Sequence, residues 1–341
     1  MKNKIISGYG ALLWSLLYGV LGLFWLMGGK GFPFGAGDPL GTDVSMLANV
    51  QAEGGALVIA IAGLIGVINA LLIIGTWGGG NIPRIIPQFI SWSFVIVIVC
   101  VVCDYRVLAL VAYVLLLKFE FLDWPSINQF LCLGGGILWG STAITYMKKR
   151  RKEDSGRAEK VSKWLEPAAI ERWGKWATYT AVSLPLIYSL TRWAWAFNIP
   201  LGVSKAFLIE EAQDTPGIWL FGAALGTTGA VGAVLTLGLI SRWGEIFPRW
   251  FPFVSGKRVP PTMAIIPATF ISIVVFITGL MYNRLWIKGA FPEGNIATYA
   301  PELTWPIWGL ALGLATLAYH LRRKGEADIA GGLSAGFERS V

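Results

Sequence analysis

Arg192 stands inside the apolar run 176 to 197, where a charged side chain is costly. A guanidinium in such a position usually faces neighbouring helices and pairs with a carboxylate. The acidic and amide side chains that we expect at a similar depth are Glu53, Asp104, Glu210, Glu211, Asp214, Asn128 and Gln129. The pattern predicts a buried polar cluster that binds a small amphipathic or anionic ligand. The alternative is that Arg192, close to the end of its run, extends its guanidinium toward the lipid headgroups.

Cys100 and Cys103 have the spacing of a dithiol redox pair and are followed directly by Asp104. In a thiol oxidoreductase, a thiolate of low pKa attacks a disulfide. The alternative is packing, because cysteines three residues apart share one helix face and thiols are common in buried helices. We favour packing for both residues and for Cys132.

The segment from Arg242 to Pro261 alternates aromatic residues, prolines and cations. Its rings and charges suit the level of the lipid headgroups. The residues that we expect there are Trp243, Arg249, Trp250, Lys257 and Arg258. A passive anchor in the membrane is the favoured interpretation, and binding of a lipid headgroup or a partner is the alternative.

Other catalytic chemistry has little basis in this sequence. His320 is the single histidine, so no zinc site is expected. The chain has no Gly-Lys-Ser/Thr phosphate loop and no Gly-x-Ser-x-Gly elbow. We therefore expect no metal, no cofactor and no enzymatic activity, apart from the redox alternative.

The composition indicates that membrane-spanning helices position these residues. Of the 341 residues, 55% are hydrophobic and only 14% are charged, whereas about a quarter are charged in soluble domains. A bilayer core needs about 20 apolar residues per helix. The runs that approach this length are 8 to 28, 54 to 76, 85 to 103, 127 to 147, 176 to 197, 216 to 240, 262 to 283 and 303 to 321. The sequence thus predicts an all-α bundle of about eight spans.

The distribution of charge predicts which side each connection faces. With the N-terminus in the cytoplasm, nearly all Lys and Arg residues lie on the cytoplasmic side, and so does the C-terminus. The opposite side holds Asp38, Asp43, Glu53, Glu120, Asp123, Glu210, Glu211, Asp214, Glu293 and Glu302. We read the net charge of +8 as a consequence of this topology and not as a nucleic-acid site. Residues 107 to 117 are apolar but too few for a span, so we expect a re-entrant or surface-lying segment on the outer side.

A basic stretch, residues 148 to 175, divides the chain into two apolar halves. We expect one four-helix repeat in residues 1 to 147, another in 176 to 324, and a cytoplasmic tail from 325 to 341. Tyr18 and Trp25 are seven residues apart, as are Tyr188 and Trp195. Other pairs that recur in the same order are Trp77-Gly78 with Trp243-Gly244, Pro83-Arg84 with Pro248-Arg249, and Ile85-Ile86-Pro87 with Ile265-Ile266-Pro267. An even number of spans per half makes the predicted repeats parallel.

Several motifs resemble those of a family of bacterial multi-pass membrane proteins of unknown function. They are Trp25-Leu26-Met27-Gly28-Gly29, Arg192-Trp193-Ala194-Trp195, the run from Arg242 to Trp250 and Gly256-Lys257-Arg258-Val259-Pro260. Smaller four-helix proteins of that group resemble one half of this chain. The resemblance implies tandem four-helix repeats and a bacterial plasma membrane, and it assigns no functional residue.

Three functional hypotheses follow. In the first, the protein binds or transports a small amphipathic or anionic ligand in a cavity between the repeats, near Arg192. In the second, it is a membrane thiol oxidoreductase that uses Cys100 and Cys103. In the third, residues 242 to 261 contact a regulatory or assembly partner. The expected partners are membrane lipids, a small-molecule or lipid ligand and a second copy of the chain, but no nucleic acid.

Overall fold

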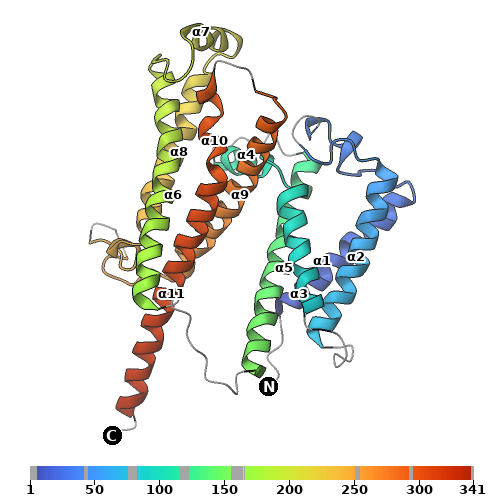
Figure 1. Ribbon diagram of the computed structural model, residues 1–341, viewed down its shortest axis with the longest axis vertical. Helices are drawn as coiled ribbons and strands as arrows, with labels where there is room; N and C mark the ends of the chain where they lie inside the picture. Colours follow the sequence, from blue (N-terminus) through green and yellow to red (C-terminus); the bar gives the residue numbers. More distant parts are fainter. Residues whose placement is uncertain are drawn as a thin grey trace. The chain divides into compact units, whose positions relative to one another are not determined.

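A computed structural model describes residues 6–41, 45–75, 83, 85–115, 123–154, 164, 166–249, 254–291 and 295–338. These residues form helices and connecting segments, with one isolated antiparallel bridge between Ile246 and Arg258 and no strand among them. The chain forms two compact units, Met1–Glu159 and Lys160–Val341 (Figure 1). The boundary lies inside the basic stretch 148 to 175, whose two ends are helical.

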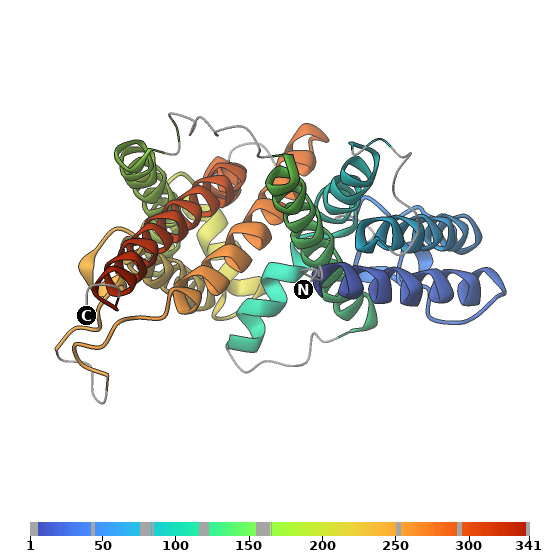
Figure 2. The same cartoon turned by 90° about the horizontal axis from the view of Figure 1, so that it is seen from below.

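Unit 1 has four long helices and one short one. The helices are α1 (Ile6–Leu26), α2 (Ala52–Ile74), α3 (Ile85–Val97), α4 (Arg106–Leu115) and α5 (Trp124–Asp154). A π-helical turn, Ile98–Val102, extends α3. In space, α1 packs against α2 and α5, and α5 packs against α3. Figures 1 and 2 both show α1 beside α2.

Unit 2 repeats this order of packing. Its helices are α6 (Pro167–Ala196), α7 (Lys205–Asp214), α8 (Ile218–Leu237), α9 (Pro261–Ile287), α10 (Ala300–Leu303) and α11 (Trp305–Glu338). Here α6 packs against α8 and α11, and α11 packs against α9. The first long helix of each unit therefore contacts the second and the fourth, and the fourth contacts the third.

Among the described residues, six helical stretches are long and apolar enough to cross a membrane. They are Ile6–Leu26, Ala52–Ile74, Ile85–Val102, Trp124–Lys149, Ile218–Leu237 and Pro261–Ile287. The other two predicted spans correspond to α6 and α11, which are as long but richer in Trp, Tyr, Thr and charged residues. Large apolar side chains such as Leu13, Val58 and Leu64 are more than half exposed on these helices, as expected of surfaces that face lipid. The chain is an integral membrane protein.

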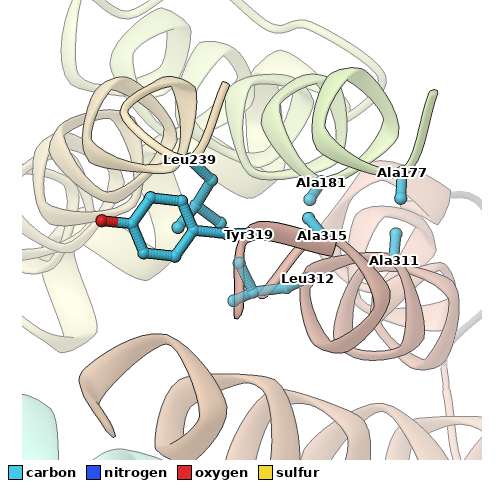
Figure 3. Packing of buried hydrophobic residues seen from close by; sticks show 7 residues of the cluster. All are labelled: Ala177, Ala181, Leu239, Ala311, Leu312, Ala315 and Tyr319. Atoms are coloured by element: carbon cyan, nitrogen blue, oxygen red, sulfur yellow. The ribbon is translucent and has the colours of Figure 1, made fainter. Parts of the chain in front are cut away.

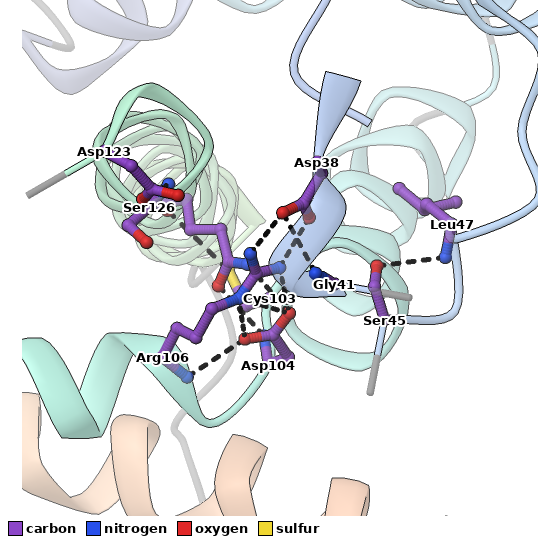
Figure 4. A network of polar contacts seen from close by, with 10 residues as sticks. Asp38, Gly41, Ser45, Leu47, Cys103, Asp104, Arg106, Asp123 and Ser126 are labelled. Carbon is purple, nitrogen blue, oxygen red and sulfur yellow. Dashed lines mark hydrogen bonds and ion pairs between the residues drawn. The ribbon is translucent and has the colours of Figure 1, made fainter. Parts of the chain in front are cut away.

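The short helix α4 covers most of the segment predicted to lie on the outer surface. Its ten residues are too few to span a bilayer. Figure 4 shows α4 running across the view while α5 is seen nearly along its axis. Val107 and Leu110 of α4 are buried, so the helix is attached to its unit by an apolar face. Residues 116 and 117 of the predicted segment lie outside the described residues.

In each unit, the connection that follows the first helix folds back over the end of that helix. We call this end of the unit its long-loop end. In unit 1, Trp25 is buried against Phe32, Phe34 and Ala56. In unit 2, Trp195 is buried with Val203 and Leu208. In both units, this apolar cluster holds the connection against the helix ends.

Small residues allow the first and fourth helices of unit 2 to approach closely. Figure 3 shows Ala177 and Ala181 of α6 facing Ala311 and Ala315 of α11. Tyr319 of α11 is fully buried beside them, and its hydroxyl donates a 2.8 Å hydrogen bond to the carbonyl of Gly244. These contacts close the end of the unit opposite the long-loop end.

In unit 1, glycines allow α1 and α2 to approach closely. A Cβ added to Gly63 would lie 2.4 Å from the Cα of Gly19, and one added to Gly22 would lie 2.5 Å from the backbone nitrogen of Ala60. Such distances leave no room for a side chain, so the two backbones are in contact.

We expect Gly63→Ala to destabilise unit 1 by about 1–3 kcal/mol, because the added methyl group overpacks the interface between α1 and α2. Gly54→Ala is the matched control, since a Cβ at Gly54 in the first turn of α2 meets nothing within 4 Å. Reversible unfolding in mixed micelles measures both. Equal stability of the two variants would contradict the close approach.

Candidate functional site

The long-loop end of unit 1 holds a buried ion cluster of Asp38, Asp104 and Arg106 (Figure 4). Asp38 follows the 3-10 turn Gly35–Gly37, and Arg106 is the first residue of α4. Asp104 follows the π-helical turn, in which the amide of Cys103 donates to the carbonyl of Ile98 at 3.0 Å. A π-turn changes the direction of the residues that follow it. Here it brings Asp104 to the guanidinium of Arg106.

Arg106 is bound on both edges of its guanidinium. Its Nη1 and Nη2 donate to the two carboxylate oxygens of Asp38 at 2.6 and 2.7 Å. Its Nε and Nη2 donate to Asp104 at 3.0 and 2.6 Å. Two such forked pairs are the geometry in which arginine binds carboxylates most strongly. Burial alone would lower the pKa of Arg106, but the hydrogen bonds to Asp104 and Asp38 raise it above its ordinary value.

Further donors complete the cluster. The side-chain amide of Gln129, on α5, donates to Asp104 Oδ2 at 2.9 Å, and its carbonyl accepts from the Asp104 backbone at 3.1 Å. The amide of Gly41 donates to Asp38 Oδ1 at 3.1 Å. Every carboxylate oxygen of the cluster therefore has at least one donor. The cluster joins the first connection, α4 and α5, and among the described residues none of its buried side-chain oxygen or nitrogen atoms is without a hydrogen-bond partner, which indicates a structural role.

The three cysteines of unit 1 form no disulfide, and Cys103 lies next to this cluster. Cys103 and Cys132 are almost completely buried, and the Cys103 thiol lies 3.8 Å from the carbonyl of Gln129. Burial, and to a lesser degree Cys132 and Asp104, raises the pKa of Cys103. A raised pKa disfavours the thiolate that redox chemistry requires. The surroundings therefore suit packing rather than disulfide exchange.

The long-loop end of unit 2 holds a second guanidinium, that of Arg192, whose side chain is 11% exposed. It lies over the rings of Tyr188 and Trp195, with 4.4 Å from its central carbon to each ring centroid. Its Nη2 pairs with the carboxylate of Glu302 and approaches the carbonyl of Thr298 at 3.4 Å. Cation–π contacts with aromatic rings hold a guanidinium without using its N–H groups. Rings of its own helix, α6, thus position Arg192, and the carboxylate of Glu302 in α10 neutralises its charge.

The polar groups around Glu302 are only partly satisfied. Glu302 is 3% exposed, and its second carboxylate oxygen, Oε2, has no hydrogen-bond partner among the described residues. In α11, which begins three residues after Glu302, the indole N–H groups of Trp305 and Trp308 likewise lack a described acceptor. Burial raises the pKa of Glu302 to about 7, although the nearby charge of Arg192 opposes this shift. Among the described residues, this site therefore has an unpartnered carboxylate oxygen, whereas every carboxylate oxygen of the cluster in unit 1 has a donor.

The structure distributes the predicted ligand residues differently from the expectation. Asp104 and Gln129 belong to the cluster of Arg106, and the side-chain carbonyl of Asn128 accepts from the Tyr18 hydroxyl at 2.9 Å. The acids of α7 (Glu210, Glu211 and Asp214) and Glu53 in the first turn of α2 are exposed or half-buried, and no described ion pair joins them to Arg192. The carboxylate that pairs with Arg192 is Glu302, which sequence reasoning counts only as a charge of the outer side.

Two arginines of α11 donate hydrogen bonds to backbone carbonyls within or just before the predicted interfacial segment, residues 242 to 261. Arg322 donates to the carbonyl of Leu239, and Arg323 donates to that of Val259 at 2.9 Å. The side chains of Trp243, Arg249, Lys257 and Arg258 are exposed, as an interfacial role requires, and Trp250 lies outside the described residues. Contact with lipid remains a prediction for these residues.

We expect Arg106→Met to destabilise the protein by about 3–5 kcal/mol, because two buried carboxylates lose their cation. Lys175→Met is the control, since Lys175 pairs with Glu171 on an exposed helix face and should be removable without measurable loss. Unfolding in mixed micelles compares the two. A stable Arg106→Met variant would refute the structural role of the cluster.

We also expect Cys103 and Cys132 to resist maleimide in the folded protein and to react after denaturation, because both thiols are buried. Mass spectrometry after labelling reports each cysteine separately. Rapid labelling of Cys103, or recovery of a Cys100–Cys103 disulfide from cells, would restore the redox hypothesis.

Comparison with known protein families, curated proteins and solved structures found no match for this chain. The resemblance to a bacterial membrane family therefore stays a prediction. The assignment to the membrane rests on the six apolar helices. What the protein binds has to be argued from the contacts of its buried polar groups.

Proposed function

We propose that this integral membrane protein binds a small amphipathic anion in its second unit, at the guanidinium of Arg192. One observation carries the proposal: buried Glu302, paired with the largely buried Arg192, keeps one carboxylate oxygen without a hydrogen-bond partner among the described residues. Buried polar groups in proteins are nearly always satisfied, so an exception next to a buried charge points to a functional position.

The comparison between the two units supports this choice. We propose that both units derive from one four-helix module, as the sequence echoes predict. Residue pairs 170 apart in the first helices include Ala11 and Ala181, Tyr18 and Tyr188, and Trp25 and Trp195. Pairs 163 apart in the second helices are Gly63 and Gly226, Gly66 and Gly229, and Ala70 and Ala233. Pairs 173 apart in the fourth helices are Gly136 and Gly309, Gly140 and Gly313, and Tyr146 and Tyr319.

Contacts inside each unit agree with these offsets. Gly63 packs on Gly19 in unit 1, and Gly226 packs on Ser189, which is 170 residues after Gly19. By the same offsets, Arg192 takes the place of Gly22, and Glu302 takes the place of Gln129. The pair of Arg192 and Glu302 is therefore a property of unit 2 alone. Unit 1 uses the corresponding place for packing and for closing its structural cluster.

The surroundings of Arg192 indicate the chemistry of the ligand. A guanidinium presents N–H groups in a fork that matches carboxylate, sulfonate or phosphate oxygens. The nearby rings offer an apolar surface, since Trp305 packs against Tyr188, Tyr282 and Trp308 at centroid distances of 5.5 to 6.0 Å. A ligand with an anionic head and an apolar body satisfies both features. Arg192 is near the end of α6, so we propose capture from the long-loop side, which charge patterning places outside a bacterial plasma membrane.

We expect Arg192→Leu to weaken binding of octanesulfonate at least about tenfold, because a hydrogen-bonded charge interaction is worth about 1.5–3 kcal/mol. Isothermal titration of the protein in lipid nanodiscs, at a fixed pH, measures the affinity. Arg192→Lys keeps the positive charge but loses the forked N–H groups. Its affinity for octanesulfonate should therefore lie between those of wild type and Arg192→Leu. Lys205→Leu is the matched control, because it removes an exposed cation at the first residue of α7.

Retained wild-type affinity in Arg192→Leu would remove the proposal, as would an equal loss in Lys205→Leu. A thermal unfolding curve for each variant in the same nanodiscs separates loss of binding from loss of fold.

A further inference from the structure

We infer that Glu302 is a proton-binding site, and that an anion arriving at Arg192 displaces the Glu302 carboxylate, which then takes up one proton. The inference rests on the proposed function and adds the coupling of the ligand to a proton. In balanced form, an ion pair of Arg192 and Glu302, one anion and one proton give an anion paired with Arg192 and a neutral Glu302 acid.

Arg192 does not depend on Glu302 for its position. The rings of Tyr188 and Trp195, both 4.4 Å from the guanidinium carbon, come from the same helix as Arg192. Thr191 and the carbonyl of Thr298 accept further, longer contacts at 3.4 Å. The guanidinium should therefore stay in place when Glu302 is protonated, and its N–H groups then become available to an incoming anion.

Glu302 is held so that its charge depends on Arg192. Among the described residues, Arg192 is its one cationic partner, and Tyr188 is the other titratable side chain of α6 close to it. From α9, Asn283 donates to the neighbouring carbonyl of Leu303 at 2.9 Å and not to the carboxylate. From α11, Trp305 contacts the ring of Tyr188. Once an anion has neutralised Arg192, a buried carboxylate here has no compensating charge.

Electrostatics determines whether binding of the anion favours uptake or release of a proton by Glu302. Burial already raises the pKa of Glu302 to about 7 while Arg192 opposes the shift. An anion on Arg192 removes that opposition, so the pKa of Glu302 rises further and the carboxylate takes up a proton. The net charge of the site is zero before and after the exchange. Exchange between two neutral states avoids leaving an unpaired charge away from water.

The exchange predicts a definite dependence on pH. Above the pKa of Glu302 in the free protein, each bound anion brings one proton, so the affinity should fall by about tenfold per pH unit. Below that pKa, Glu302 is already protonated and the affinity should level off. Octanesulfonate is the appropriate probe, because it keeps its own charge throughout this pH range.

The test is titration of octanesulfonate into nanodisc-embedded protein from pH 6 to pH 9. Wild type should lose affinity as pH rises, whereas Glu302→Gln, a neutral mimic of the acid, should lose the slope and bind more tightly than wild type at pH 9. Asp214→Asn, at an exposed acid of α7, should keep the wild-type slope. A wild-type slope in Glu302→Gln would overturn the inference.

Infrared spectroscopy separates this inference from the proposed function. The ligand-free wild type should show a carboxylic-acid carbonyl band that disappears between pH 6 and pH 9 and is missing in Glu302→Gln. Absence of such a band in wild type would overturn the proton site, whether or not octanesulfonate binds. A normal band together with no binding of octanesulfonate at any pH would refute the proposed ligand and the coupling, but leave the proton site.

Discussion

A guanidinium buried among apolar helices has to be neutralised, and the two ways in which this chain does so distinguish its halves. Arg106 is bound by two carboxylates, and Gln129 and Gly41 complete their hydrogen bonds. Arg192 has one carboxylate, and that carboxylate keeps an unpartnered oxygen. The first arrangement ties connections to helices. We propose that the second can exchange its partner, because aromatic rings also hold the cation.

The common order of helix packing makes this difference interpretable. In each unit the first helix contacts the second and the fourth, and small residues sit where backbones meet. If both units derive from one module, as we propose, two changes, from Gly22 to Arg192 and from Gln129 to Glu302, convert a packed helix end into an ion pair. In this proposal one copy of the module serves stability and the other is modified for binding.

Sequence reasoning predicts the helical membrane architecture because apolar length is a strong signal, although six of the helices in the described part of the chain, and not eight, are apolar enough by themselves. It also singled out Arg192, since a charge in an apolar run is conspicuous. It missed Glu302 because α10 has only four residues, and nothing local distinguishes this acid from those of α7. It missed the cluster of Arg106 because the partners Asp38 and Asp104 come from separate connections. In the proposed repeat, the offset of 173 residues that relates Gln129 to Glu302 is the sequence feature that points to this acid.

The central claim is that the protein exchanges the carboxylate of Glu302 for an external anion at Arg192. The most direct measurement is a pair of electron cryomicroscopy maps of the protein in lipid nanodiscs with and without saturating octanesulfonate, at pH 8, where Glu302 is ionised in the ligand-free protein. The account predicts new density for a sulfonate beside the Arg192 guanidinium, with the Glu302 carboxyl group moved away and the cluster of Arg106 unchanged. Sulfonate density elsewhere only, with the pair of Arg192 and Glu302 intact in both maps, would contradict it.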